Sequence, residues 1–166
     1  YSAISAGYDE LYGDEQSAKL VEVLRLLSFE GDDVILDVGC GTGSITRLIG
    51  EVVRRAVGID ISREMVESGR HRGLELLVCD AENLPFRGRA FDKVVSFTVL
   101  QNLADPTKAL GEMWRACHGS MALTVLKAGW SPQRIAHLVG RYLSPHRVFE
   151  LEKDFLCLGE VRSSGP

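Results

Sequence analysis

The stretch DVGCGTGS, at residues 37–44, decides the fold of this chain. It closes a short apolar run, residues 34–38, that is typical of a strand buried on both faces of a sheet. It opens residues 44–53, in which apolar side chains recur at helical spacing. Glycines between a strand and a helix allow positive φ and let a ligand approach the backbone. The stretch therefore predicts the ligand-binding turn of an α/β protein.

The alternation of strand and helix patterns continues outward from this turn. An amphipathic helix is expected over residues 15–27, ahead of the turn. Ser62, Asp105 and Ser131 are suitable helix N-caps, and proline follows the last two. Gly119 is expected to stop the helix that Asp105 begins. The expected strands are residues 34–38, 56–60, 74–79, 91–97 and 121–126, and two short strands within 148–161 that meet near 153–154.

Five strands that alternate with helices predict a parallel sheet in a doubly wound α/β fold. In such folds ligands bind beyond the carboxyl ends of the strands. Arginines at residues 54–55, 70–72 and 87–89 come just before strands, so they are expected at the opposite end of the sheet. The sequence thus predicts a ligand-binding site at the carboxyl ends of the strands and a solvated basic surface at their amino ends.

The composition is that of one soluble globular domain. The chain has 166 residues, of which 45% are hydrophobic and 25% charged, with a net charge of −4 and a pI near 5.6. The acidic balance argues against a general nucleic-acid binder. No apolar run approaches the roughly 18 residues of a membrane span. The four cysteines lie far apart, which predicts reduced thiols in a cytoplasmic protein and no metal site.

The glycine-rich turn departs from the dinucleotide-binding pattern, which has glycine at its first, third and sixth positions. The sixth position here is Ser44. Asp37 would repel a pyrophosphate but suits a ligand with an ammonium group. Asp60, about 20 residues further on, can accept hydrogen bonds from ribose hydroxyls or cap the next helix. Asp80 can contact an adenine amino group or form an Asx turn. These features argue against a nicotinamide oxidoreductase.

Four motifs follow one another in order: DVGCGTGS (37–44), GIDIS (58–62), CDAENLPF (79–86) and FDKVVSFTVLQN (91–102). Together they resemble class I S-adenosylmethionine-dependent methyltransferases, and within that class the UbiE-like branch. The resemblance covers about residues 34–126. It implies a Rossmann-like doubly wound sheet of seven strands in the order 3-2-1-4-5-7-6, mostly parallel with one antiparallel strand. A single methyltransferase domain is expected over residues 1–161, with an N-terminal lid and helix segment over 1–30 and a loose tail over 162–166.

The resemblance also implies which residues bind S-adenosylmethionine. Asp37 would hold the amino group of its methionine part, and Asp60 would hold its ribose. The backbone of Gly39, Cys40 and Gly41 would approach the methionine and ribose parts, and Ile61, Asp80 and Ala81 would surround the adenine. The carbonyl of Phe97 would face the amino group, and Tyr8 in the N-terminal segment would lie over the cofactor. Many relatives have two histidines where this chain has Gln101-Asn102, so a histidine-based substrate role is not implied there.

The sequence therefore predicts a methyltransferase that uses S-adenosylmethionine, releases S-adenosylhomocysteine and methylates a small-molecule acceptor. The acceptor and its methylated atom stay open, and no side chain is identified as a general base. A second reading is methylation of tRNA or a translation protein with an activator subunit, and a homodimer is also open. A chain that needs an activator is expected to expose an apolar edge and to be poorly stable alone. A third reading is an S-adenosylmethionine-binding module without catalysis.

Overall fold

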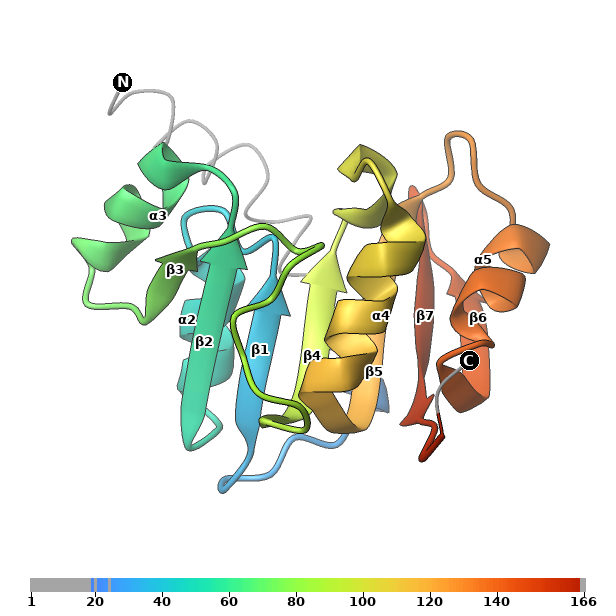
Figure 1. Ribbon diagram of the computed structural model, residues 1–166, viewed down its shortest axis with the longest axis horizontal. Coiled ribbons are helices and arrows are strands. Elements are labelled where there is room, and N and C mark those ends of the chain that lie inside the picture. Colours follow the sequence, from blue (N-terminus) through green and yellow to red (C-terminus); the bar gives the residue numbers. More distant parts are fainter. Residues whose placement is uncertain (1–18, 20, 24, 165–166) are drawn as a thin grey trace.

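The computed structural model describes residues 19–164 except residues 20 and 24, and in this part of the chain seven strands form one sheet (Figure 1). Their order is β3-β2-β1-β4-β5-β7-β6. Neighbouring strands from β3 to β5 pair in parallel, whereas β7 is antiparallel to β5 and to β6. The predicted Rossmann-like sheet is therefore confirmed. The strands are β1 (Val34–Val38), β2 (Arg55–Asp60), β3 (Leu76–Val78), β4 (Phe91–Phe97), β5 (Cys117–Leu126), β6 (Leu143–Glu150) and β7 (Asp154–Val161).

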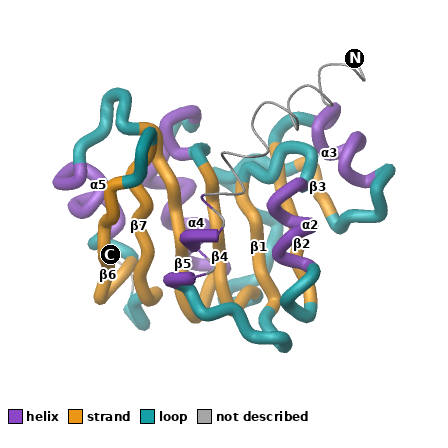
Figure 2. Tube along the Cα trace, turned by 180° about the vertical axis from the view of Figure 1, so that it is seen from behind, coloured by secondary structure: helices purple, strands orange, loops and turns teal. Residues whose placement is uncertain are grey.

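Helices cover both faces of the sheet. One face carries α2 (Ser44–Gly50) and the helical residues 19, 21–23 and 25–26, here called the N-terminal helix (Figure 2). The other face carries α4 (Pro106–Ala116) and α5 (Pro132–Val139), which stand in front of the sheet in Figure 1. α3 (Arg63–Arg70) contacts β2 and β3 at one edge, and the short helix η1 (Leu100–Asn102) follows β4.

β1 shows how the sequence pattern produces these layers. Successive side chains of a strand point to opposite faces. Ile35 accordingly packs with the residues of α2 and the N-terminal helix, whereas Leu36 and Val38 pack in the core beneath α4. Asp37 shares the face of Ile35, so its carboxyl group lies beneath α2. A continuous apolar strand with one acidic residue therefore places that acid inside the molecule.

The predicted helix starts are confirmed. The side chains of Ser62, Asp105 and Ser131 accept hydrogen bonds from backbone N–H groups in the first turns of α3, α4 and α5. These contacts satisfy donors that have no partner inside a helix. Because a cap and its helix are neighbours in the sequence, the start of each helix can be predicted from the local sequence alone.

The prediction that Gly119 stops a helix is wrong. α4 ends at Ala116, and β5 begins at the next residue. Gly119 lies within β5, where an added Cβ would come 2.3 Å from the carbonyl oxygen of Asp92. The β4–β5 register shifts at this point, between Phe91 and Lys93. The glycine is thus explained by a close approach between two strands, a contact that the local sequence does not contain.

Other predicted boundaries shift by a few residues. α2 ends at Gly50 rather than near residue 53, and β3 begins at Leu76 rather than at residue 74. β6 begins at Leu143, ahead of the range expected for the terminal strand pair, because the fully buried Leu143 pairs with Val161. At β6, strand pairing rather than local propensity thus sets where the element begins.

The end of the described chain is tied to the molecule. Arg162, which the sequence assigns to the tail, donates its backbone N–H to the Tyr142 carbonyl at 2.9 Å. Its own carbonyl accepts a hydrogen bond from Trp114 Nε1 at 3.0 Å. Within the described residues no helix has the length and apolar character of a membrane span. The same residues contain no group of three acidic, histidine or cysteine side chains placed to hold a metal ion.

Candidate cofactor site

A cleft of about 780 Å³ opens at the carboxyl ends of the central parallel strands. Its walls come from the glycine-rich turn, the end of β2, the segment after β3 and the segment after β4. The part of the lining that the structure describes includes three carboxylates, those of Asp60, Asp80 and Glu82. Among the described lining residues there is no lysine, arginine or histidine. The cleft is therefore suited to a ligand that carries positive charge and hydroxyl groups.

The glycine-rich turn is fixed to β2 and pressed against the segment after β4. The backbone N–H groups of Gly39 and Cys40 both donate to the Ile59 carbonyl, at 2.8 and 2.9 Å. Gly39 has φ +78°, and an added Cβ would lie 2.2 Å from Val99 Cγ2. Only glycine combines this conformation with this approach. Gly41, by contrast, has open space where its Cβ would stand.

Asp60 is held at the end of β2 by two backbone donors. Its Oδ2 accepts the N–H of Gly41 at 2.9 Å, and its Oδ1 accepts the N–H of Ser62 at 2.8 Å. The helix cap itself is Ser62, whose hydroxyl accepts the N–H of Met65. The carboxylate of Asp60 thus joins the turn to the start of α3 and lines the cleft with a fixed orientation.

Asp37 lies behind the turn rather than among the residues that line the cleft. It is 2% exposed, and its Oδ2 accepts a hydrogen bond from the Thr46 hydroxyl at 2.7 Å. Burial is the main cause that raises the pKa of this carboxyl to about 7; the Thr46 hydrogen bond lowers the pKa and the nearby charge of Asp60 adds a smaller rise, and both are included in that value. Cys40 is also outside the cleft lining, and burial raises the pKa of its thiol well above the usual range.

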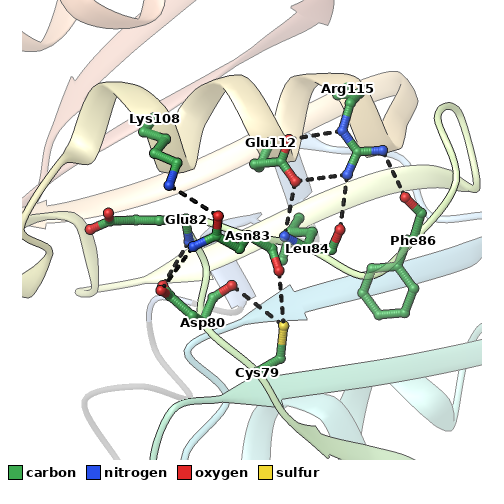
Figure 3. A network of polar contacts seen from close by, with 9 residues as sticks. All are labelled: Cys79, Asp80, Glu82, Asn83, Leu84, Phe86, Lys108, Glu112 and Arg115. Atoms are coloured by element: carbon green, nitrogen blue, oxygen red, sulfur yellow. Dashed lines mark hydrogen bonds and ion pairs between the residues drawn. The ribbon is translucent and has the colours of Figure 1, made fainter.

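The segment after β3 is anchored to α4 by side chains (Figure 3). Arg115 donates to the carbonyls of Phe86 and Leu84 at 2.7 and 3.0 Å, and Glu112 accepts the N–H of Leu84 at 2.9 Å. The Arg115 guanidinium also pairs with Glu112 at 2.7 Å and lowers the pKa of that carboxyl. This anchor fixes the wall of the cleft that carries Asp80.

Asp80 adopts the Asx turn that the sequence left as an alternative. Its Oδ1 accepts the N–H of Glu82 at 2.9 Å, and its Oδ2 accepts from the Asn83 side chain at 3.1 Å. The residue nevertheless lines the cleft beside the buried Ala81. Its structural role and a ligand-facing position therefore coexist.

The segment after β4 has an unusual backbone. Thr98 has φ +61°, which non-glycine residues seldom adopt. Its carbonyl accepts the side-chain N–H groups of Gln101 and Asn102, at 2.6 and 3.5 Å. Gln101 Oε1 is buried and accepts no hydrogen bond from the described residues. The Gln101-Asn102 pair thus presents fixed amide groups to the cleft.

The structure brings most of the sequence-predicted residues together. Asp37 and Cys40 lie behind the turn, and Tyr8 lies outside the described residues. Sequence reasoning missed Met65 and Val99 in the lining. Met65 follows the Ser62 cap by one helical turn, a spacing that could have placed it there, whereas the contact of Val99 with Gly39 has no local signal. The predicted residues that line the cleft are Gly39, Gly41, Asp60, Ile61, Asp80, Ala81 and Phe97.

Comparison with protein families gives one match to the centre of the chain. Residues 36–120 match a family model described as a methyltransferase domain. This range contains the glycine-rich turn, Asp60, the segment after β3 and the whole of β4. It therefore includes nearly all of the cleft.

Curated relatives match the same region. An uncharacterized protein of Methanocaldococcus jannaschii is 32% identical over 69% of this chain and 45% of its own length. The human "Probable tRNA methyltransferase 9B" is 39% identical over 63% of this chain and 23% of its own. The UbiE ubiquinone/menaquinone biosynthesis C-methyltransferase of Desulfotalea psychrophila is 36% identical over 51% and 37%. The chain thus spans less than half the length of these relatives.

Solved structures share the whole architecture. The chain bound to the Trm112 methyltransferase activator of Haloferax volcanii superposes with a TM-score of 0.79, and the match covers 96% of both chains. Sequence identity is 21%, so this similarity concerns the fold. The structure of an S-adenosylmethionine-dependent methyltransferase from Thermotoga maritima gives a TM-score of 0.78 at 18% identity over 97% and 95% of the two chains.

Proposed function

The chain belongs to the methyltransferase domain family, and from this premise we propose that it transfers a methyl group from S-adenosylmethionine to a small-molecule acceptor. The family match and the UbiE relative agree with the resemblance that the four sequence motifs carry. The observation that carries the proposal is the carboxylate of Asp60, which two backbone N–H groups orient and which faces a cleft whose described lining residues include no basic side chain.

The residues of the cleft fit this cofactor. S-adenosylmethionine has a sulfonium, an ammonium and a carboxylate, hence a net charge of about +1. Asp60 can accept both ribose hydroxyls, because a carboxylate has about four lone-pair sites and two are used by the backbone. Ile61 and Ala81 supply apolar surface for an adenine ring, and Asp80 can accept from its amino group. Gly41 leaves room for close approach of the ligand to the turn.

The cofactor, when bound, supplies an electrophilic methyl group on its sulfonium. The part left to the chain is to orient the two reactants and to exclude water. Phe97, Val99 and Leu126 give the inner cleft an apolar wall. Gln101, whose side-chain N–H donates to the Thr98 carbonyl, has a fixed position in the same cleft. The geometry therefore favours catalysis by positioning.

A second candidate function is supported by other observations. It is methylation of a tRNA or a translation protein by a chain that an activator subunit completes. One relative is named as a tRNA methyltransferase, and one structural neighbour was solved with an activator. The edge strand β3 also exposes apolar side chains, with Leu77 37% and Val78 38% exposed. Ile61, in the loop that follows β2, is 75% exposed. Such an apolar edge is what the activator reading predicts.

The experiment that tests the proposed cofactor is a thermal shift with S-adenosylmethionine, S-adenosylhomocysteine and NAD. At a ligand concentration 100 times Kd the expected gain is about 2.7 kcal/mol, or roughly 5–10 °C for a domain of this size. Asp60→Ala should abolish the shift with both sulfur ligands. Asp32→Ala, which removes an exposed carboxylate in the turn before β1, should leave the shift intact. NAD should give no shift.

The outcomes separate the candidate functions. A shift with NAD, or no shift with either sulfur ligand, contradicts the proposed cofactor. Binding of S-adenosylhomocysteine without methylation of any offered acceptor favours the non-catalytic module. To test the activator reading, a Trm112-type subunit is added to the wild type and to Leu77→Asp. A rise in melting temperature that is lost in Leu77→Asp, with cofactor binding retained, favours that reading over a self-sufficient enzyme.

A further inference from the structure

A buried polar cluster adjoins the cleft on the sheet face that carries the N-terminal helix. It consists of Lys19 from that helix, Thr98 after β4, Thr124 in β5 and Asp154 at the start of β7. Lys19 is 5% exposed and Asp154 is fully buried. Asp154 pairs with Leu126, and Leu126 lines the cleft, so the cluster lies at the cofactor end of the sheet.

The cluster converges on the hydroxyl group of Thr98. Lys19 Nζ lies 3.1 Å from Thr98 Oγ1 and 2.8 Å from Asp154 Oδ2. Thr98 Oγ1 also lies 3.4 Å from Asp154 Oδ1 and 3.3 Å from Thr124 Oγ1. Asp154 Oδ2 accepts no directed hydrogen bond from the described residues, so the ion pair with Lys19 compensates its burial. Loss of Lys19 alone would therefore leave a buried charge unpaired.

Thr98 needs such support because of its backbone. It is β-branched and has φ +61°, a combination that persists only where the surroundings enforce it. Its N–H donates to the carbonyl and to the hydroxyl of Thr124, at 3.0 and 2.9 Å. The cluster thus holds the side chain of Thr98 by hydrogen bonds, while Thr124 in β5 accepts the hydrogen bond of its backbone amide.

The conformation of Thr98 sets the wall of the cleft. Its carbonyl accepts the Gln101 side chain at 2.6 Å and so aims that amide. Val99, the next residue, occupies the space beside the α-carbon of Gly39. Phe97, the preceding residue, lines the cleft. A change of backbone conformation at residue 98 would turn all three side chains.

We propose that Lys19 and Asp154 are positioning residues for the cofactor cleft, which act by holding Thr98 in its left-handed conformation. This inference rests on the proposed function, because the affected ligand is S-adenosylmethionine or its product. A role in stability alone explains the cluster less well, since a buried ion pair is seldom more stabilising than apolar side chains of similar size. The N-terminal helix is in this way coupled through Thr98 to the cofactor cleft.

The test compares two lysine–aspartate pairs at opposite ends of the sheet, the buried Lys19–Asp154 pair and the partly buried Lys93–Asp33 pair. Lys19→Met with Asp154→Asn removes both charges of the proposed pair and keeps the side chains similar in size. Lys93→Met with Asp33→Asn does the same at the amino ends of β1 and β4, away from the cleft. We expect the first variant to bind S-adenosylhomocysteine about tenfold more weakly by calorimetry, and the second to bind it as the wild type does. Thermal unfolding of both variants reports the purely structural cost.

Glycine at position 98 provides a second, independent readout. Because glycine adopts positive φ without strain, Thr98→Gly should make the support unnecessary. In the Thr98→Gly background, removal of the Lys19–Asp154 pair should change Kd by less than about twofold. Equal affinity in the wild type and the Lys19–Asp154 variant overturns the inference. It is also overturned if removal of the pair weakens binding of S-adenosylhomocysteine as much in the Thr98→Gly background as in the wild type. A wild type that binds no S-adenosylhomocysteine overturns the proposed function and this inference together.

Discussion

Asp37 is an acidic residue whose protonation is controlled by its position in the strand. Because side chains alternate between the two faces along β1, the carboxyl group of Asp37 lies beneath α2, where Thr46 is its hydrogen-bond partner. Loss of water around it raises its pKa to about 7, whereas the same carboxyl in an unfolded chain titrates near 3.8. The residue is therefore partly protonated at neutral pH in the folded chain, and folding takes up protons between these two values.

This shift predicts how stability changes with pH. The native state binds more protons than the unfolded state between pH 4 and 7, so the contribution of Asp37 to stability falls as the pH rises through this window. The total change is on the order of 4 kcal/mol. Asp37→Asn, which keeps an oxygen for Thr46, should remove this decline. Melting temperatures of wild type and variant at pH 4, 5, 6, 7 and 8 check it, and parallel curves would show that Asp37 is ionised normally.

The loop between β3 and β4 owes its shape to α4 rather than to its own sequence. Arg115 holds two of its carbonyls and Glu112 one of its amides, so the residues that line the cleft here need no helix or strand of their own (Figure 3). Hydrogen bonds from a charged group to a carbonyl are stronger than neutral ones. A loop anchored in this way can present Asp80 and Ala81 at a fixed depth in the cleft.

Arg115→Met should release this loop. The loss of the guanidinium bonds is expected to cost about 2 kcal/mol, which lowers the melting temperature by roughly 4–8 °C. Affinity for S-adenosylhomocysteine should also fall, by about tenfold, because the cleft wall that carries Asp80 is no longer fixed. Arg47→Met is the matched control, since Arg47 forms an exposed pair with Glu51 on α2. Unchanged affinity in Arg115→Met would show that the loop holds its shape without the anchor.

The sequence predicted those elements whose causes are local. The caps at Ser62, Asp105 and Ser131 bond to residues two or three positions away, and the glycine-rich turn lies between its own strand and helix. Arg115 had no comparable signal, because its carbonyl partners lie 29 and 31 positions away. Gly119 was misread for the same reason, since the strand that approaches it is remote. Long-range contacts of this kind are determined only once the sheet is assembled.

Charge is distributed unevenly over the whole molecule. Among the described lining residues the only charged side chains are carboxylates, whereas Arg54 and Arg55 lie at the start of β2 and Arg87 and Arg89 precede β4, at the opposite end of the sheet. A cationic ligand that approaches the cleft thus meets attractive charges, and the field of the chain favours its entry. The overall net charge of −4 acts in the same direction.

This distribution predicts a difference between two ligands of nearly equal shape. S-adenosylmethionine has a net charge of about +1 and its demethylated product is neutral, so salt should weaken binding of the first more than of the second. Between about 20 mM and 500 mM NaCl we expect a three- to fivefold loss for S-adenosylmethionine and less than a twofold loss for the product. Titration calorimetry at both salt concentrations measures this. Equal losses would mean that the carboxylates do not act on the sulfonium ligand.

The direct passage from α4 into β5 has a mechanical consequence. With no residue between Ala116 and Cys117, the last turn of α4 continues directly into β5. Arg115 fastens one wall of the cleft to the end of α4, and Thr124 in β5 holds the other wall by the amide of Thr98. Both walls are therefore attached to one continuous segment of the chain. We expect this shared attachment to make the two walls move together when a ligand enters or leaves.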